Sequence, residues 1–106
     1  MAWIYLVIAG LLEIGWAIGL KYTEGWSRVW PSVWTALAMV GSFIFLAQAL
    51  RVIPVGTGYA IWTGIGAAGT AALGIILFGE SAAAPRLVCI GLIISGIIGL
   101  KLTSPI

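Results

Sequence analysis

Four long apolar segments follow one another in this chain, and they constrain its fold more than any other feature. They cover approximately residues 3–20, 32–50, 55–78 and 87–103, and short turns that contain glycine or proline separate them. A helix of about 20 residues can cross the hydrocarbon core of a bilayer. Only 8% of the residues are charged, whereas a soluble domain carries roughly 25%. The pattern therefore predicts an all-α integral membrane protein, with four transmembrane helices in one domain over residues 1–106.

Several other classes of protein fit the sequence poorly. Transmembrane β-strands would alternate apolar and polar residues, and these segments are continuously apolar. The first segment lacks the basic start and the small-residue cleavage site of a signal peptide, so we expect it to remain in the protein. With no histidine and a single cysteine, Cys89, we expect no metal site and no cofactor, and Cys89 is interpreted as a packing residue. Five Lys and Arg residues form no basic patch, so nucleic acid is not an expected partner.

Glu13 is the one charged residue that lies deep inside a predicted helix. Ten residues separate it from Trp3, or about 15 Å of helix, which brings its carboxyl group near the middle of the bilayer. An acidic residue at that depth costs at least ~2.5–3.5 kcal/mol on insertion scales, and such residues usually face a wet cavity. Its carboxyl group can hold a proton or a cation but cannot favourably hold both, which predicts exchange of protons for a cation. The alternative is a protonated Glu13 that only hydrogen-bonds a neighbouring helix.

Four residues near the expected depth of Glu13 carry side chains suited to lining a cation site. Trp16 shares a helical face with Glu13, and Tyr59 and Trp62 are three apart on the third segment. Aromatic faces attract cations, and the indole of Trp16 or the phenol of Tyr59 could donate a hydrogen bond to the carboxylate. Ser42 is a small polar residue in an otherwise apolar segment. The alternative for each aromatic residue is contact with lipid or packing in the core.

A glycine-rich stretch interrupts the third segment. Gly64, Gly66 and Gly69 match the pattern G-x-G-x-x-G, but no strand precedes them, so the stretch is not a dinucleotide-binding motif. Within a membrane helix such glycines permit close helix contact or a bend. We therefore predict a hinge at these three glycines.

Positive charge does not favour either orientation in the membrane. Arg51, Lys101 and the terminal amine fall on one face, and Lys21, Arg28 and Arg86 fall on the other. The positive-inside rule needs an excess on one side. We therefore expect the chain to insert in both orientations, and the alternative is that a further determinant fixes a single one.

Four helices of this size can scarcely enclose a path for a substrate. A pair of chains would supply eight helices and two Glu13 carboxyl groups that face one chamber and titrate as a coupled pair. Gly91, Ser95 and Gly99 are spaced four apart on the fourth segment, in a pattern typical of helix–helix contacts in membranes. We predict that this stripe contributes to the contact between two chains in an antiparallel homodimer.

At this point several motifs resemble those of the small multidrug resistance transporters, along nearly the whole chain. Within that family the chain looks most similar to the guanidinium exporters, because Leu12 and Glu13 are followed by Trp16, and Gly-Ile-Ile-Gly-Leu-Lys occupies positions 96–101. The other matching motifs are Lys-Tyr-Thr-Glu-Gly at 21–25, Trp-Pro-Ser at 30–32, Pro-Val-Gly-Thr at 54–57, Tyr-Ala-Ile-Trp-Thr-Gly-Ile-Gly at 59–66 and Gly-Glu at 79–80.

The resemblance implies a dual-topology antiparallel homodimer that exchanges protons for guanidinium across a bacterial inner membrane. It implies that Glu13 binds both substrate and protons, and Lys101 matches a marker of the subtype. The residues that match positions lining or ordering the family's site are Trp16, Ser42, Tyr59 and Trp62.

Two rival functions remain open from the sequence. One is a broader exporter of quaternary ammonium compounds within the same family, and the other is a small structural subunit of a larger membrane complex. An enzyme is not expected, because a single intramembrane acid without a nucleophile or a metal cluster provides no assembled reaction site.

Overall fold

The computed structural model describes residues 1–104, which form four α-helices joined by short turns. All four helices are long and apolar enough to cross a membrane, so the all-α, four-span architecture expected from the sequence is confirmed. No β-strand occurs within residues 1–104. The helices are α1 (Ala2–Tyr22), α2 (Val29–Ala49), α3 (Val55–Phe78) and α4 (Ala84–Thr103).

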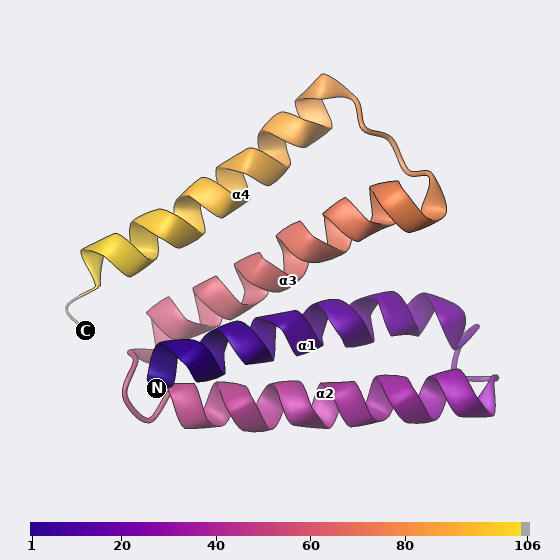
Figure 1. Cartoon of the computed structure of the whole chain (residues 1–106), viewed down its shortest axis with the longest axis horizontal. Helices are drawn as coiled ribbons and strands as arrows, with labels where there is room; N and C mark the ends of the chain where they lie inside the picture. The colour runs from indigo at the N-terminus through magenta and orange to yellow at the C-terminus, as the bar shows by residue number, and fades with distance from the viewer. Residues whose placement is uncertain (105–106) are drawn as a thin grey trace.

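The helices lie side by side in one layer, in the order α4, α3, α1, α2 (Figure 1). The molecule is only 17 Å in its shortest extent, against 43 and 35 Å in the other two. α1 packs against both α2 and α3, whereas α4 packs against α3 alone among the described helices. A single layer of helices leaves both of its faces uncovered by the chain itself. This arrangement therefore buries few residues and leaves many large apolar side chains exposed.

The buried core lies where α1, α2 and α3 meet, and it extends into the turn between α2 and α3. Small side chains of α1 allow close approach of the neighbouring helices, and α4 contributes no buried residue. The core consists of Leu6, Ala9, Leu46, Ala49, Ile53, Ile61 and Trp62.

Two helices begin earlier than the sequence predicted, and proline explains both differences. α4 begins at Ala84 rather than near residue 87, with Pro85 in its first turn, and its 20 residues make a full membrane span. α2 begins at Val29 rather than near residue 32, so Pro31 also lies in a first turn. The first N–H groups of a helix have no partner within the helix, so proline costs little there.

The glycine-rich stretch of α3 brings it into close contact with both of its neighbours. A Cβ atom at Gly66 would overlap the Glu13 side chain, and one at Gly69 would overlap Ile14 of α1. A Cβ atom at Gly64 would lie 2.8 Å from Ile97 of α4. α3 is continuous through this stretch. The glycines thus serve close packing in this structure, and a hinge at Gly64, Gly66 and Gly69 stays a prediction.

The stripe of small residues on α4 meets little of its own chain. A Cβ atom at Gly91 or Gly99 would find no atom within 4 Å, and the Ser95 hydroxyl donates a hydrogen bond to the Gly91 carbonyl of the same helix. The stripe is therefore available for contact with another molecule. Its role as a dimer contact stays a prediction.

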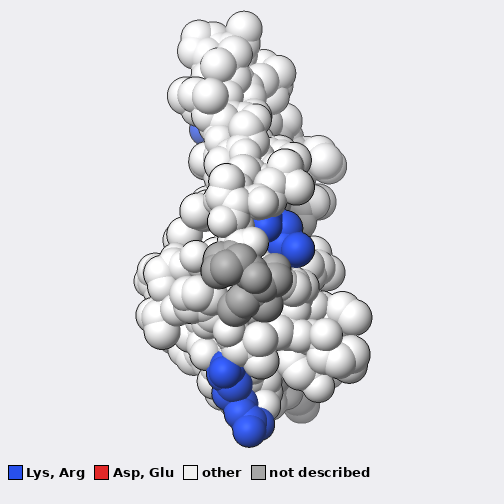
Figure 2. Space-filling model, turned by 90° about the vertical axis from the view of Figure 1, so that its left-hand side faces the viewer, with Lys and Arg blue, Asp and Glu red and all other residues white. Residues whose placement is uncertain are grey.

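The two ends of the helical layer carry charge as the sequence suggested. The turn after α2, which holds Arg51, and the last turn of α4, which holds Lys101, lie at the same end of the layer as the N-terminus (Figure 1). The face shown in Figure 2 displays basic side chains and no acidic side chain. The opposite end carries Lys21 in the last turn of α1 and Arg86 in the first turns of α4.

Candidate functional site

Glu13 and Trp16 of α1 face α3 across an open cavity of about 220 Å³. Glu13 lies near the middle of α1, so the cavity is far from both ends of the helix. Most of the remaining lining side chains are small, which leaves room for a ligand beside the carboxyl group. The lining residues are Glu13, Trp16, Ala17, Thr63, Gly66, Ala67 and Thr70.

The carboxyl group of Glu13 fits into this position because residue 66 has no side chain. A Cβ atom at Gly66 would overlap the Oε1 and Cδ atoms of Glu13. Glu13 Oε1 is buried and has no hydrogen-bond partner within residues 1–104, and no described Lys or Arg forms an ion pair with it. A buried polar atom without a partner is costly, and in native proteins it calls for an explanation such as a bound ligand.

Trp16 lines the same cavity but does not hydrogen-bond to Glu13. Its Nε1 atom is buried and has no partner among the described residues. The ring makes an edge-on contact with Phe43 of α2, at 6.4 Å between centroids and 69° between planes. Two residues that line the cavity thus carry unused polar atoms, an acceptor on Glu13 and a donor on Trp16. A bound ligand could pair with both atoms, whereas the contact between the helices leaves both without a hydrogen bond.

Ser42 joins three helices beside the cavity. Its hydroxyl is fully buried and donates a 2.7 Å hydrogen bond to the Ala9 carbonyl of α1. The indole Nε1 of Trp62 on α3 donates a 3.0 Å hydrogen bond to the same hydroxyl. Ser42 therefore orients the Trp62 ring.

A row of aromatic rings connects the cavity with the other predicted site residues. Trp16 contacts Phe43, Phe43 contacts Trp62 at 5.9 Å, and Trp62 contacts Tyr59 at 5.4 Å between centroids. Tyr59 is more than half exposed and makes no hydrogen bond to Glu13 in the described structure. The structure therefore places Glu13 and Trp16 in the cavity itself. Ser42, Tyr59 and Trp62 lie beside it, connected through Phe43.

Comparison with known proteins identifies the family. A sequence model described as "Small Multidrug Resistance protein" matches residues 1–93. The chain belongs to the small multidrug resistance family. This finding confirms the resemblance that the motifs showed, and with four apolar helices it places this family member in a bacterial inner membrane as a multi-pass protein.

Relatives of this small multidrug resistance protein carry a more specific name. The chain is 62% identical over 104 residues to a "Guanidinium exporter" of Yersinia pseudotuberculosis, which covers 98% of this chain and 100% of the relative. It is 60% identical over 104 residues to proteins of the same name from Citrobacter freundii and Salmonella choleraesuis, with 98% and 99% covered. These names describe transporters and not enzymes.

Sequence reasoning about this small multidrug resistance protein missed two threonines and a phenylalanine. Thr63 and Thr70 line the Glu13 cavity, and Phe43 bridges Trp16 and Trp62. The threonines had a signal in the sequence, because hydroxyl residues seven apart in an apolar helix share one face. Phe43 had none, because its contacts depend on how α2 packs against the other helices.

Lys101 lies away from the cavity of this family member. Its Nζ atom is 4.4 Å from the centroid of the Trp3 ring, a cation–π contact that joins the end of α4 to the start of α1. α4 and α1 otherwise do not pack against each other. This contact places the Lys101 ammonium over Trp3, and Lys101 does not line the Glu13 cavity.

Proposed function

We propose that this protein is a proton-coupled antiporter that exports guanidinium from the bacterial cell. The observation that carries the proposal is the carboxyl group of Glu13, which is held against Gly66 in a cavity at mid-helix with its Oε1 atom unpartnered. The names of the relatives support guanidinium as the cation.

Guanidinium matches the chemistry of this cavity. The cation is planar and permanently charged, and its N–H groups bind a carboxylate in a bidentate manner. It is more weakly hydrated than a compact ammonium ion, so moving it out of water costs less. The Trp16 ring offers an aromatic face beside Glu13 and narrows the space available to bulkier cations.

Competition between protons and guanidinium for Glu13 would couple the entry of protons to the export of guanidinium. A protonated carboxyl group has lost the charge that attracts the cation, and a carboxylate that holds guanidinium is a poor proton acceptor. If the site changes the side to which it is open only when it holds a proton or a cation, then a site that has released its cation outside must bind a proton or a new cation before it opens to the inside again. Protons that enter the cell would then drive guanidinium out.

We propose that the working unit is an antiparallel homodimer. The single layer of helices leaves both faces uncovered, α4 has no buried residue, and the two ends carry balanced positive charge. A second copy in the opposite orientation would close the chamber and supply the inverted repeat on which alternating access commonly depends. The residues assigned to this contact are Gly91, Ser95 and Gly99, and those assigned to the bend that exchanges access are Gly64, Gly66 and Gly69.

Electrophysiology of the purified protein on solid-supported membranes tests the function directly. Proteoliposomes that contain this protein alone should give currents when guanidinium is added, and weaker currents or none with tetramethylammonium and cetyltrimethylammonium. Stronger currents with the quaternary ammonium compounds would instead support a broader exporter. No current and no cation-driven proton movement, from protein that is correctly folded, would contradict transport by this chain alone and support a structural subunit.

A further inference from the structure

Thr70 of α3 has a buried hydroxyl that makes no hydrogen bond. Its Oγ1 atom is shielded from solvent and has no partner within residues 1–104. A threonine in an apolar helix usually satisfies its hydroxyl on a carbonyl one turn earlier. Thr63 does this, because its Oγ1 donates a 2.7 Å hydrogen bond to the Tyr59 carbonyl. The free hydroxyl of Thr70 therefore needs a separate explanation.

Thr70 lies where two cavities meet. One is the Glu13 cavity, and the other is a cavity of about 360 Å³ between α1, α3, the turn that precedes α4 and the start of α4. The residues that line both cavities are Ala17, Ala67 and Thr70. Thr70 is the one polar residue of these three, so it provides the hydrogen-bonding group at the junction.

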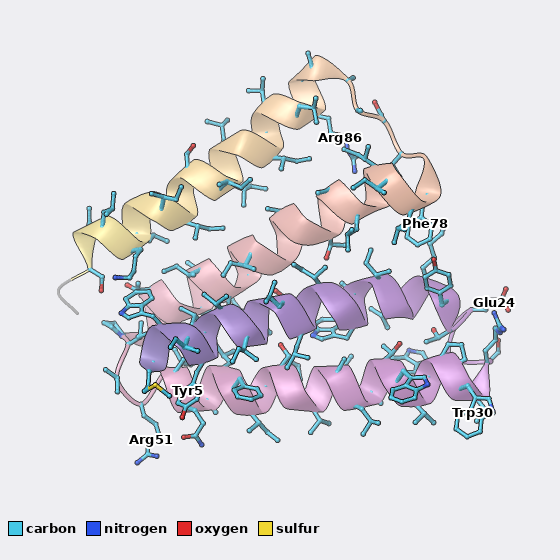
Figure 3. The ribbon with its side chains drawn as sticks, in the orientation of Figure 1. Tyr5, Glu24, Trp30, Arg51, Phe78 and Arg86 are labelled. Atoms are coloured by element: carbon cyan, nitrogen blue, oxygen red, sulfur yellow. The ribbon has the colours of Figure 1, made fainter. Side chains whose placement is uncertain are left out.

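Each charged side chain of the second cavity already contacts a neighbour, although the Nε atom of Arg86 has no hydrogen-bond partner within residues 1–104. The Lys21 ammonium lies 5.2 Å from the centroid of the Phe78 ring, and Arg86 forms a 2.8 Å ion pair with Glu80. Figure 3 shows Phe78 near the end of α3 and Arg86 pointing from α4 toward it. The hydroxyl of Thr70, by contrast, has no such neighbour.

We infer that Thr70 is a substrate-binding residue, whose Oγ1 atom accepts a hydrogen bond from an N–H group of the cation held at Glu13. This inference rests on the proposed function. Guanidinium has more N–H groups than one carboxylate can bind, and those left over need acceptors once the cation is out of water. Thr70 lies one helical turn beyond Gly66, which touches the Glu13 carboxyl group, and it lines the same cavity. A quaternary ammonium ion has no N–H group and gains nothing from this hydroxyl.

Replacement of Thr70 by the isosteric valine tests the inference. The KM for guanidinium, measured from currents on solid-supported membranes, should rise about five- to tenfold in Thr70→Val, which is the usual effect of losing one hydrogen bond. Thr70→Ser keeps the hydroxyl and should stay within about twofold of the wild type. Currents with tetramethylammonium, whatever their size in the wild type, should be unchanged in Thr70→Val.

Thr35→Val provides the matched control. Thr35 Oγ1 is also buried and unpartnered, but it lies against Gly19 and outside both cavities. This variant should keep the wild-type KM. An unchanged KM in Thr70→Val, an equal rise in Thr35→Val, or a parallel loss with tetramethylammonium would each overturn the inference. If Thr70→Val does not fold, comparing Thr70→Ala with Thr70→Ser decides in the same way. A wild type with neither guanidinium current nor guanidinium-driven proton movement would contradict the proposed function itself.

Discussion

The indole of Trp62 donates a 3.0 Å hydrogen bond to the hydroxyl of Ser42, and this hydroxyl in turn donates a hydrogen bond to the Ala9 carbonyl. The two bonds link α1, α2 and α3 through a single side chain that no water reaches. They also fix the Trp62 ring against Phe43 and Tyr59. Ser42 thus has a positioning role that requires no direct contact with a substrate.

Removing the hydroxyl in Ser42→Ala should destabilise the protein. Trp62 Nε1 would lose its partner and the Ala9 carbonyl would lose its additional bond from Ser42, which should lower the free energy of unfolding by about 1–2 kcal/mol. Unfolding of the purified protein in detergent by increasing fractions of dodecyl sulfate measures this change. Ser32→Ala is the control, because that exposed hydroxyl bonds only to the Arg28 carbonyl at the start of its own helix and the change should be small. Equal stabilities of the two variants would contradict the role assigned to Ser42.

Gly66→Ala should disturb the site through a single methyl group. A Cβ atom there would overlap the Glu13 carboxyl group, so the carboxyl group or the contact between α1 and α3 must shift. Overpacking of this kind costs about 1–3 kcal/mol, and the displaced carboxyl group should bind guanidinium more than about tenfold more weakly. Binding can be followed by tryptophan fluorescence. Gly56→Ala on the same helix, where a Cβ atom would meet nothing within 4 Å, should bind as the wild type does.

The helices and the position of Glu13 near the middle of α1 could be predicted from the sequence, because each depends on a pattern within a single segment. Apolar segments of membrane-spanning length are visible in any window, and Glu13 is conspicuous among apolar neighbours. The position of Trp16 in the cavity followed from its spacing after Glu13. These features depend only on the geometry of one helix.

Features that depend on the register between helices could not be read in the same way. Whether the Ser42 hydroxyl meets Trp62 depends on how far one helix slides along its neighbour, and whether the Thr70 hydroxyl bonds to a carbonyl depends on the rotamer that its surroundings permit. Gly66 and Gly69 were recognised as small residues, but the identity of Glu13 and Ile14 as their neighbours needed the structure. The same limit applies to Phe43, whose place between two tryptophans comes only from packing.

Glu13→Gln should abolish transport and leave the fold intact. Glutamine has nearly the shape of a protonated glutamate, so the contact with Gly66 can persist, but it has no charge for the cation and takes up no proton. Guanidinium currents should fall to the level of empty liposomes, and size-exclusion profiles should match the wild type. Glu24 is exposed in the turn between α1 and α2 (Figure 3). The control variant Glu24→Gln should therefore transport normally. Wild-type currents in Glu13→Gln would contradict the mechanism.

Acidic pH should weaken guanidinium binding, because protons and the cation compete for one carboxyl group. The charged form binds the cation, so the apparent Kd should rise about tenfold for each unit that the pH falls once most of the carboxyl group is protonated. At higher pH the Kd should become constant. Tryptophan fluorescence titrations over a range of pH measure both the rise of the Kd at acidic pH and its constant value at higher pH. A Kd that does not change with pH would show that proton and cation occupancy are independent.

Trp16→Gly should widen the range of cations and weaken selectivity for guanidinium. The Trp16 ring forms one wall of a cavity of about 220 Å³ and is held in place by Phe43, so its removal enlarges the space beside Glu13. Tetramethylammonium currents should rise relative to guanidinium currents in the same preparation. Trp34→Gly is the control, because Trp34 is exposed on α2 and the change also places a glycine inside a helix, at a cost of about 1 kcal/mol. The comparison separates loss of stability from loss of selectivity. If both variants give the same ratio of currents as the wild type, Trp16 does not act as a filter, and the limits on substrate size must come from the partner chain or from the route to the cavity.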